Sequence, residues 1–185
     1  MSKPNSGHFS GTSGHIISQK LISTNEKKSD IIKPKVNGLD LREHPTKYKQ
    51  PGAKKRKMLS EKERNRTLSK SEYKLKYWFS RFSKRKAKGI DEFWKEERRR
   101  IKAGEPTTRN WAASQIQEIL DKKRPTYKGN PMQSHHTYSA AKYPHLADRK
   151  ELIFPVTHHE HLYGYHGGNY KNSLPGKPIK NIIDF

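Results

Sequence analysis

The sequence has no cysteine, which excludes a disulfide framework and a thiolate metal site. No apolar run approaches the roughly 20 residues that a membrane-spanning helix requires, so membrane insertion is not expected. The first residues also lack the apolar segment of a signal peptide. If the protein is exported, we expect its export signal on a region outside this chain, which would then be a fragment of a longer protein.

Apolar and acidic residues are both scarce. Apolar side chains make up 30% of the 185 residues, which predicts one domain with a modest core. Asp and Glu number 18 against 40 Lys and Arg, so the net charge is +22. Such a charge predicts a polyanionic partner, either nucleic acid or an acidic protein, and does not bear on the fold.

The charge is concentrated in residues 47–124, which hold 26 Lys or Arg and 10 Asp or Glu. Residues 1–46 are rich in Ser, Gly, Asn and Lys, and we interpret them as a partly ordered N-terminal arm or linker. Residues 47–185 are predicted to form the functional domain.

Residues 47–124 are predicted to be mainly helical. Capping-box patterns at Ser60–Glu63 and Ser69–Glu72 predict a short helix and then a longer one that continues to Lys88, with Gly89 as its C-cap. Apolar residues at helical spacing predict two further helices, at residues 91–103 and 113–122.

Two basic faces of these helices are candidates for phosphate binding. They contain the residues that we predict to contact nucleic acid: Lys84, Arg85, Lys86, Arg98, Arg99 and Arg100. An arginine from either face could also stabilise charge in a transition state. A run of charged residues can also be simply the solvent-exposed face of a helix. Here the excess is of positive charge alone, which favours contact with phosphate. The run at residues 54–57 is interpreted as a flexible nucleic-acid contact.

Seven of the ten histidines lie between His135 and His166, within a predicted strand, strand, helix unit. Residues 131–138 and 152–156 have the character of strands. Thr157 and Glu160 then form a capping box for a helix over residues 158–165, which the glycines at 167–168 should end.

This order of elements predicts a metal-dependent nuclease. Neighbouring strand residues point to opposite faces, so one of His135 and His136 could bind a cation while the other deprotonates a water. His161 and His166 would supply further imidazole ligands, which suit zinc or nickel better than magnesium. These two residues are five apart, about 140° around an ideal helix, so His158 with His161 is a competing pair.

At these residues the sequence resembles the GHH-type clade of HNH/endonuclease VII-like nucleases, which form C-terminal toxin domains of bacterial polymorphic toxins, including LXG-type toxins. The resemblance extends from about residue 47 to the end. Its features are the His135–His136 pair, KYPHLAD, a strand ending in Pro-Val-Thr, Glu160–His161, the run from His166 to Asn169, RNWAASQIQEIL, Phe93–Trp94 and NSLPGKP. Ser134 departs from the pattern, because the family usually has glycine there.

The resemblance implies an α+β fold in which basic helices (residues 47–124) precede a small ββα-metal core (125–170) and a wrapping tail (171–185). It assigns His135, His161 and His166 as metal ligands and His136 as the general base. Apart from the resemblance, Asn169 and Asn172 are each placed to orient a ligand or to hold their loop by side-chain hydrogen bonds, and Asn169 is the one that we predict in the catalytic site. The divalent ion would be Zn, Mg, Mn or Ni.

The resemblance also implies secretion by bacteria as part of a larger toxin, action in the cytoplasm of a target cell, and an acidic immunity protein as a partner. The leading hypothesis is therefore a DNA endonuclease with little sequence preference. RNA as the substrate of the same core is the nearest alternative. A third hypothesis is a non-catalytic basic module that binds nucleic acid and holds a structural metal.

Overall fold

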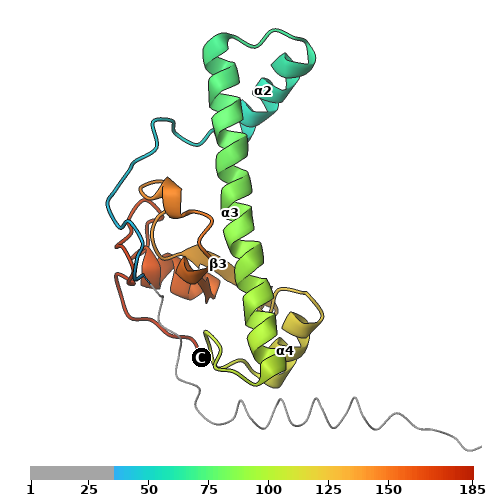
Figure 1. The fold of residues 1–185 in the computed structure, drawn as a ribbon, viewed down its shortest axis with the longest axis vertical. Helices are drawn as coiled ribbons and strands as arrows, with labels where there is room; N and C mark the ends of the chain where they lie inside the picture. The colour runs from blue at the N-terminus through green and yellow to red at the C-terminus, as the bar shows by residue number, and fades with distance from the viewer. Residues whose placement is uncertain (1–35) are drawn as a thin grey trace, which may run out of the picture.

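The structure is a computed structural model that describes residues 36–185. Its longest element is helix α3 (Lys70–Ala103), whose 34 residues span roughly 50 Å at 1.5 Å per residue. The globular core packs against the C-terminal half of α3, whereas the N-terminal half extends away from it beside helix α2 (Ala53–Arg64; Figure 1). Helices and short antiparallel strands are both present, which confirms the predicted α+β class.

Helix α3 replaces the two helices that the sequence predicted on either side of Gly89. The predicted capping box is present at its start, where Ser69 Oγ accepts from the Glu72 amide (3.2 Å) and Glu72 accepts from the Ser69 amide (3.0 Å). The prediction that Gly89 is a C-cap was wrong, because the chain stays helical there until Gly104, whose φ of +66° ends the helix.

Gly89 is instead required by a close approach of two backbones. A Cβ at this position would lie 2.8 Å from the carbonyl oxygen of Ala147 and 3.1 Å from the Cα of Asp148. Neither atom belongs to a flexible side chain that could move aside. Gly89 therefore allows the loop that contains Ala147 and Asp148 to lie directly on α3.

Replacing Gly89 with alanine should destabilise the fold by about 1–3 kcal/mol, as overpacking of a close contact does. Helix propensity alone would give the opposite sign, since alanine is favoured over glycine by about 1 kcal/mol within a helix. Urea unfolding would distinguish the two effects, with Ser80→Ala on the exposed face of α3 as the control. A stabilised Gly89→Ala variant would contradict the proposed packing.

The other helices differ from prediction at their ends. Helix α2 begins at Ala53, with Gly52 as its N-cap, so the predicted start at Ser60 was wrong. Leu59, which packs against α3, is its one buried residue, and this contact selects where the helix forms more strongly than the local capping pattern. Helix α4 (Ala113–Leu120) ends two residues before the predicted end.

The predicted strand, strand, helix unit is present but more compact. Strand β3 (Gln133–His136) pairs antiparallel with β4 (Ile153–Val156), and His135 lies opposite Phe154 in this ladder. Pro155 is tolerated because each strand of a two-stranded sheet is an edge. Helix η3 (Glu160–Tyr165) follows β4.

Short elements surround this unit. A hairpin of β1 (Thr126–Tyr127) and β2 (Asn130–Pro131) precedes β3, so the strand predicted from residue 131 starts later. Two 3-10 turns, η1 (Pro144–Leu146) and η2 (Lys150–Leu152), lie between β3 and β4.

The main core forms where α3, α4 and the β3–β4 ladder meet. It contains the buried residues Phe93, Trp94, Ile101, Trp111, Ile116, Ile119, Met132 and Ile153. The indole of Trp94 also donates to Ser134 Oγ (3.0 Å), which fixes β3 against α3. Across residues 36–185, no helix combines the length and apolar character that crossing a membrane would need.

Both ends of the described chain lie on this core. The amides of His44 and Thr46 donate to the carbonyls of Lys142 (2.8 Å) and Ala141 (3.1 Å), so residues 36–46 lie against the loop after β3. The amides of Ile179 and Lys180 both donate to the carbonyl of Gly164 (2.9 Å each), so the final segment lies on η3. The predictions for residues 1–35 fall outside the described residues.

Candidate metal centre

The structure brings His135, His161 and His166 together. Each offers one ring nitrogen, and these three atoms lie within 4.8 Å of one another. His135 comes from β3 and is 6% exposed, His161 lies within η3, and His166 is the C-cap of η3. The Nε2 atoms of His161 and His166 are 3.2 Å apart. Three imidazoles from two elements therefore converge on one point.

The geometry of helix η3 brings His161 and His166 to the same side, although they are five residues apart. Over Glu160–Tyr165 it is a π-helix, and the amide of His166 donates to the carbonyl of His161 (3.1 Å). In such an i→i+5 helix, residues five apart lie nearly above one another, unlike in an α-helix. Gly167 and Gly168 then end the helix with φ of +58° and +92°, as predicted.

The competing ligand His158 is not part of this cluster. Its side chain is exposed, and its Nδ1 lies 3.4 Å from Nε2 of Gln133. The structure therefore pairs His161 with His166, the pair that depends on the wider helix.

Backbone and side-chain carbonyl groups set the tautomers of two of these histidines. Nδ1 of His161 contacts Oε1 of Gln133, and Nδ1 of His166 contacts the carbonyl oxygen of Asn172. A carbonyl oxygen can only accept, so each Nδ1 carries the proton and each Nε2 presents a lone pair to the centre of the cluster. This is the tautomer in which histidine binds metal.

These residues fit a divalent metal ion. With Zn–N bonds of about 2.0–2.1 Å, neighbouring ligands of a tetrahedral site are about 3.3 Å apart. The 3.2 Å between Nε2 of His161 and Nε2 of His166 agrees with this separation. Two facing lone pairs repel each other at that distance unless a cation lies between them.

Burial keeps His135 and His161 neutral. Burial and, second, the charges of the neighbouring histidines lower the pKa of His135 to about 2. The same causes lower the pKa of His161 to about 4. Since protonation blocks metal binding, both groups are in the ligand form throughout the neutral pH range.

Without metal, the protein should lose stability as the pH falls. The usual histidine pKa is about 6.5 in an unfolded chain, so below that pH the unfolded state binds more protons than the folded state. The free energy of unfolding in chelator should therefore decrease by about 1–3 kcal/mol between pH 7 and pH 5. Urea unfolding at several pH values measures this slope. We expect a shallower slope for His135→Gln, and a flat wild-type profile would contradict the burial of neutral histidines.

Gln133 is a positioning residue that the sequence analysis missed. Its side-chain oxygen fixes the ring of His161, and no local sequence pattern marks it. Removing such an outer partner typically weakens metal binding 10–100-fold, and we expect a loss of this size for Gln133→Ala. Competition with a chromophoric chelator gives the affinity, and exposed Asn130→Ala on the neighbouring hairpin is the control. Equal affinities for the two variants would remove Gln133 from the site.

His136 points away from the three ligands. Its Nε2 lies 3.0 Å from the carbonyl oxygen of Ala147, so Nε2 donates and Nδ1 is left as the acceptor. Burial lowers the pKa of His136, the bond to Ala147 raises it, and the charge of Lys86 lowers it further; the net shift is downward. A neutral imidazole with a free nitrogen at the end of β3 has the protonation state that a general base needs.

A buried ion pair supports the start of η3. Thr157 and Glu160 form the predicted capping box, with bonds of 2.8 Å and 3.0 Å between their amides and side chains. Both carboxylate oxygens of Glu160 also accept from the guanidinium of Arg109, at 2.6 Å and 2.7 Å. Arg109 lies within the run RNWAASQIQEIL, which carried part of the family resemblance, but its role was not predicted.

The end of the chain covers this ion pair. The Phe185 ring lies over the guanidinium of Arg109, with 4.0 Å between Cζ and the ring centroid. The amide of Asp184 donates to Glu160 Oε1 (2.8 Å), and its carboxylate accepts from the Thr157 hydroxyl. The tail thereby completes the pocket that fixes the first turn of the ligand-bearing helix.

Two roles were expected for Asn169, orienting a ligand or holding its loop, and its hydrogen bonds are those of the second role. Its side-chain oxygen accepts from the amide of Lys171 (3.0 Å), and its backbone carbonyl accepts from the amide of Asn172 (2.9 Å). Asn172 is the residue whose carbonyl orients His166. The contribution of Asn169 therefore reaches the cluster through its loop.

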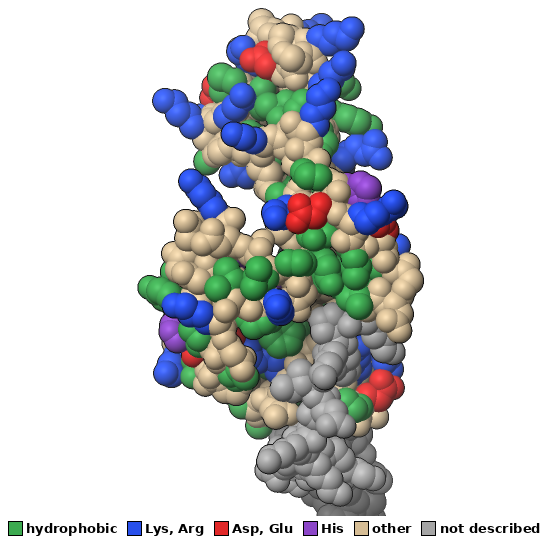
Figure 2. Space-filling view, turned by 90° about the vertical axis from the view of Figure 1, so that its left-hand side faces the viewer, with side chains coloured by type: hydrophobic (Ala, Val, Ile, Leu, Met, Phe, Trp, Pro, Cys, Tyr) green, Lys and Arg blue, Asp and Glu red, His purple; other side chains and the backbone are tan. Residues whose placement is uncertain are grey.

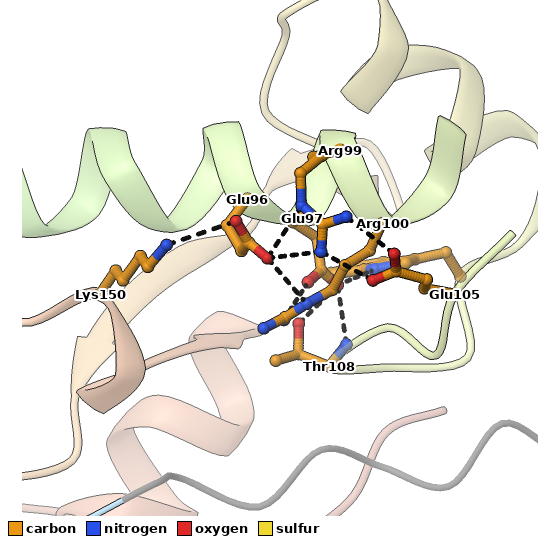
Figure 3. A network of polar contacts seen from close by, with 8 residues as sticks. Glu96, Glu97, Arg99, Arg100, Glu105, Thr108 and Lys150 are labelled. Carbon is orange, nitrogen blue, oxygen red and sulfur yellow. Dashed lines mark hydrogen bonds and ion pairs between the residues drawn. The ribbon is translucent and has the colours of Figure 1, made fainter. Parts of the chain in front are cut away.

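The predicted phosphate contacts on the second basic face are bonded within the protein, and Figure 3 shows Arg99 and Arg100 among their acidic partners. Arg98 donates to the carbonyl of Ile119 (2.8 Å). Arg99 bridges Glu96 and Glu105, and Arg100 lies 3.5 Å from Glu96. These contacts hold α3 to α4 and to the following loop.

On the first basic face, Arg85 donates to the carbonyl of His145 and to Asp148 (2.8 Å each). Lys84 is exposed, and half-buried Lys86 lies over the ring of Phe82 at 5.3 Å. Of the six predicted basic residues, Lys84 and Lys86 are therefore the two whose side chains bond to no acidic group or carbonyl within residues 36–185.

A second group of possible ligands lies at Asp40, His44 and His145, again within 4.8 Å. Arg42 occupies both carboxylate oxygens of Asp40 (2.8 Å each), and this contact holds the pKa of Asp40 well below its usual range. Because the only carboxylate of the group is already neutralised, we assign no metal to it.

Residues 80–157 match the family described as GHH signature containing HNH/Endo VII superfamily nuclease toxin. The match includes His135 and His136 and ends at Thr157, before η3. It confirms the resemblance that the sequence suggested. No curated protein and no solved structure matches the chain.

Proposed function

We propose, from the match of residues 80–157 to the GHH-signature HNH/Endo VII superfamily of nuclease toxins, that the domain is a metal-dependent endonuclease that hydrolyses DNA with little sequence preference. The observation that carries the proposal is the convergence of three imidazoles whose orientation is fixed from outside. A purely structural metal would need these three histidines alone. A catalytic site also needs a base, and His136, next to His135 and with a pKa lowered by burial, fits that role.

The proposed roles divide between two faces of β3. His135, His161 and His166 would hold one divalent ion, which when bound supplies a Lewis acid for the charge that develops on the phosphate and the leaving oxygen. His136 Nδ1 would accept the proton of the attacking water. The two histidines of β3 occupy the last two ladder positions, so one phosphate at the strand end could meet both functions.

The surroundings of His136 support its assignment as base. Its bond to the Ala147 carbonyl orients the ring, as the second partner of a catalytic histidine does. Its lowered pKa keeps it unprotonated somewhat below the usual histidine range, so the acid limb of the pH–rate profile should lie below pH 6.5. Lys86 supplies positive charge on the same side, and we propose it with Lys84 as a phosphate contact.

The donor set indicates the class of metal. Three neutral nitrogens and no carboxylate in the cluster favour zinc- or nickel-like ions over magnesium, which prefers oxygen ligands. Manganese would be accepted more weakly.

The family and the charge also suggest the biological setting. We propose that the domain is secreted by bacteria as part of a larger toxin and acts in the cytoplasm of a target cell. A producer of such a toxin needs a neutralising protein, and the net charge of +22 favours an acidic one.

Separate incubation of plasmid DNA and total RNA with the protein tests the proposed function. Each substrate is combined with zinc, nickel, manganese, magnesium or chelator. We expect nicking and linearisation of the plasmid that chelator abolishes. Degradation of RNA alone would keep the chemistry and replace the substrate, whereas retardation of DNA without cutting would favour a binding module.

A further inference from the structure

Helix α2 and the first part of α3 form a helical hairpin that extends beyond the nuclease core (Figure 1). We call residues 53–81 of this hairpin the basic arm. Arg85 of α3 donates to the carbonyl of His145 and to Asp148, in the loop before β4. The 15 residues from Lys70 to Arg85 advance roughly 22 Å along the helix axis, so the arm reaches well outside the candidate active site.

The basic arm contributes little to the hydrophobic core. Leu59 is the only buried residue of α2, and the first buried residue of α3 is Phe82. Besides the packing of Leu59, two ion pairs join the helices, between Lys62 and Glu72 and between Lys76 and Glu63, each at 2.6 Å. Burial of apolar area therefore does not explain the length of the hairpin.

The charge of the basic arm is strongly one-sided. It holds eleven Lys or Arg and three Glu, a net charge of +8 in 29 residues. Two of the three carboxylates are used in the ion pairs within the hairpin. Like charges at this density repel one another and destabilise a helix pair unless a polyanion neutralises them.

Most of these cations are free to meet such a partner. Nine are exposed and form no ion pair with any residue from 36 to 185: Lys54, Lys55, Arg56, Lys57, Arg64, Arg66, Lys70, Lys74 and Arg81. Figure 2 shows Lys and Arg side chains over the upper part of the molecule, where the arm lies, with few acidic ones among them. They come from both helices, so the positive surface runs along the arm.

Two exposed tyrosines lie on the same element. Tyr73 and Tyr77 are 57% and 54% exposed, and their rings stack with centroids 6.2 Å apart. Their hydroxyls are neutral donors of the kind that bind phosphate oxygens. They do not form the broad apolar centre that a protein–protein interface usually has.

We propose that the basic arm is a second nucleic-acid site, which binds the phosphate backbone of a duplex away from the bond that is cut. This inference rests on the proposed nuclease function and adds to it a binding element outside the metal centre. At 3.4 Å per base pair along one strand, roughly 22 Å corresponds to about six base pairs. Contacts to the backbone alone carry no sequence information, which agrees with cleavage of little sequence preference.

The test compares two variants of equal charge change in the full chain. The arm variant carries Gln at Lys54, Lys57, Lys70 and Lys74, all exposed and unpaired within the described residues. The control carries Gln at Lys102, Lys122, Lys123 and Lys177, which are exposed outside the arm. A third variant has Arg at the four arm positions and preserves the charge. Circular dichroism checks that each variant is folded.

Fluorescence anisotropy with a labelled 30-base-pair DNA duplex in chelator measures binding without cleavage. For the arm variant we expect affinity at 0.1 M salt to fall at least tenfold, and the slope of log K against log salt to decrease by about 0.9 for each lost phosphate contact, roughly 2–4 in total. The arginine variant should bind like wild type. At saturating DNA the cleavage rate of the arm variant should be unchanged, with KM raised.

Equal affinity and salt slope for the arm variant and the control would overturn the proposal. A second outcome would also overturn it: an arm variant that binds polyaspartate, a model acidic chain, more weakly than wild type but binds the duplex equally well. The arm would then serve to bind an acidic protein. Absence of cleavage by every variant would contradict the proposed nuclease function, while the binding comparison would still decide the role of the arm.

Discussion

Replacing His136 with glutamine should lower the rate of DNA cleavage by about 10²–10⁴-fold, the usual contribution of a general base. Glutamine can still donate to the Ala147 carbonyl and fills a similar volume, but it cannot accept a proton from water near neutral pH. The ligands His135, His161 and His166 are untouched by the change. Metal affinity and the free energy of unfolding should therefore stay close to those of wild type.

Single-turnover cleavage with metal titration on the same samples measures both quantities. His44→Ala, on the exposed N-terminal segment, is the matched control and should cut like wild type. His161→Ala should lose metal binding and cleavage together, which separates a ligand from a base. A His136→Gln variant with the wild-type rate would show that another group takes the proton.

Replacing Arg109 with methionine should destabilise the fold by about 3–5 kcal/mol, because it leaves the buried carboxylate of Glu160 without its cation. Burial is the largest single influence on Glu160 and opposes its ionisation. The hydrogen bonds from Arg109, Asp184 and Thr157, together with the charge of Arg109, outweigh burial, so the pKa of Glu160 lies below its usual range. The side chains of both residues are no more than 5% exposed, so solvent cannot replace the lost partner.

Thermal and urea unfolding measure this loss, and a paired change tests its cause. Arg109→Met combined with Glu160→Gln should be less destabilised than Arg109→Met alone, since no buried charge remains. Arg99→Met removes an exposed arginine from its pairs with Glu96 and Glu105, and we expect a cost of about 1 kcal/mol or less. Equal costs for Arg99→Met and Arg109→Met would contradict a special role for the buried pair.

Local signals predicted the parts of this structure that depend on nearby residues. The capping boxes at Ser69 and Thr157 formed, and the glycines after His166 end the helix that carries the ligands. The histidine cluster was also predicted, because its members lie on elements whose order the sequence indicates. The caps and the helix end depend on residues a few positions apart, whereas the cluster joins His135 to residues 26 and 31 positions later and followed from the order of the elements.

Features that depend on distant contacts were not predictable in the same way. Gly89 was interpreted as a helix end because glycine usually serves that purpose, whereas here it accommodates the backbone of Ala147. The ion pair of Arg109 and Glu160 joins residues 51 apart, and Gln133 meets His161 across 28 residues. The π-helix depends in part on the tail, whose amides bond to the Gly164 carbonyl.

The basic faces show a similar limit of sequence reasoning. Charge runs identified nucleic acid as a partner, but not which cations are free to bind it. Arg98, Arg99 and Arg100 are bonded within the protein, whereas the lysines of α2 that were expected to be flexible lie on an ordered helix. The carbonyl and carboxylate groups that bond to these arginines are brought near them by the fold, so the sequence alone does not show which cations are occupied.

The most direct test of the metal centre is to titrate chelator-stripped protein with zinc while plasmid cleavage is recorded in the same samples, and to repeat the titration with nickel and manganese. We predict that cleavage rises with bound metal, reaches its maximum at about one ion per chain, and is absent from His161→Ala at the same metal concentration. Full cleavage in the presence of chelator, or saturation of a single metal site without any cleavage of nucleic acid, would contradict the account.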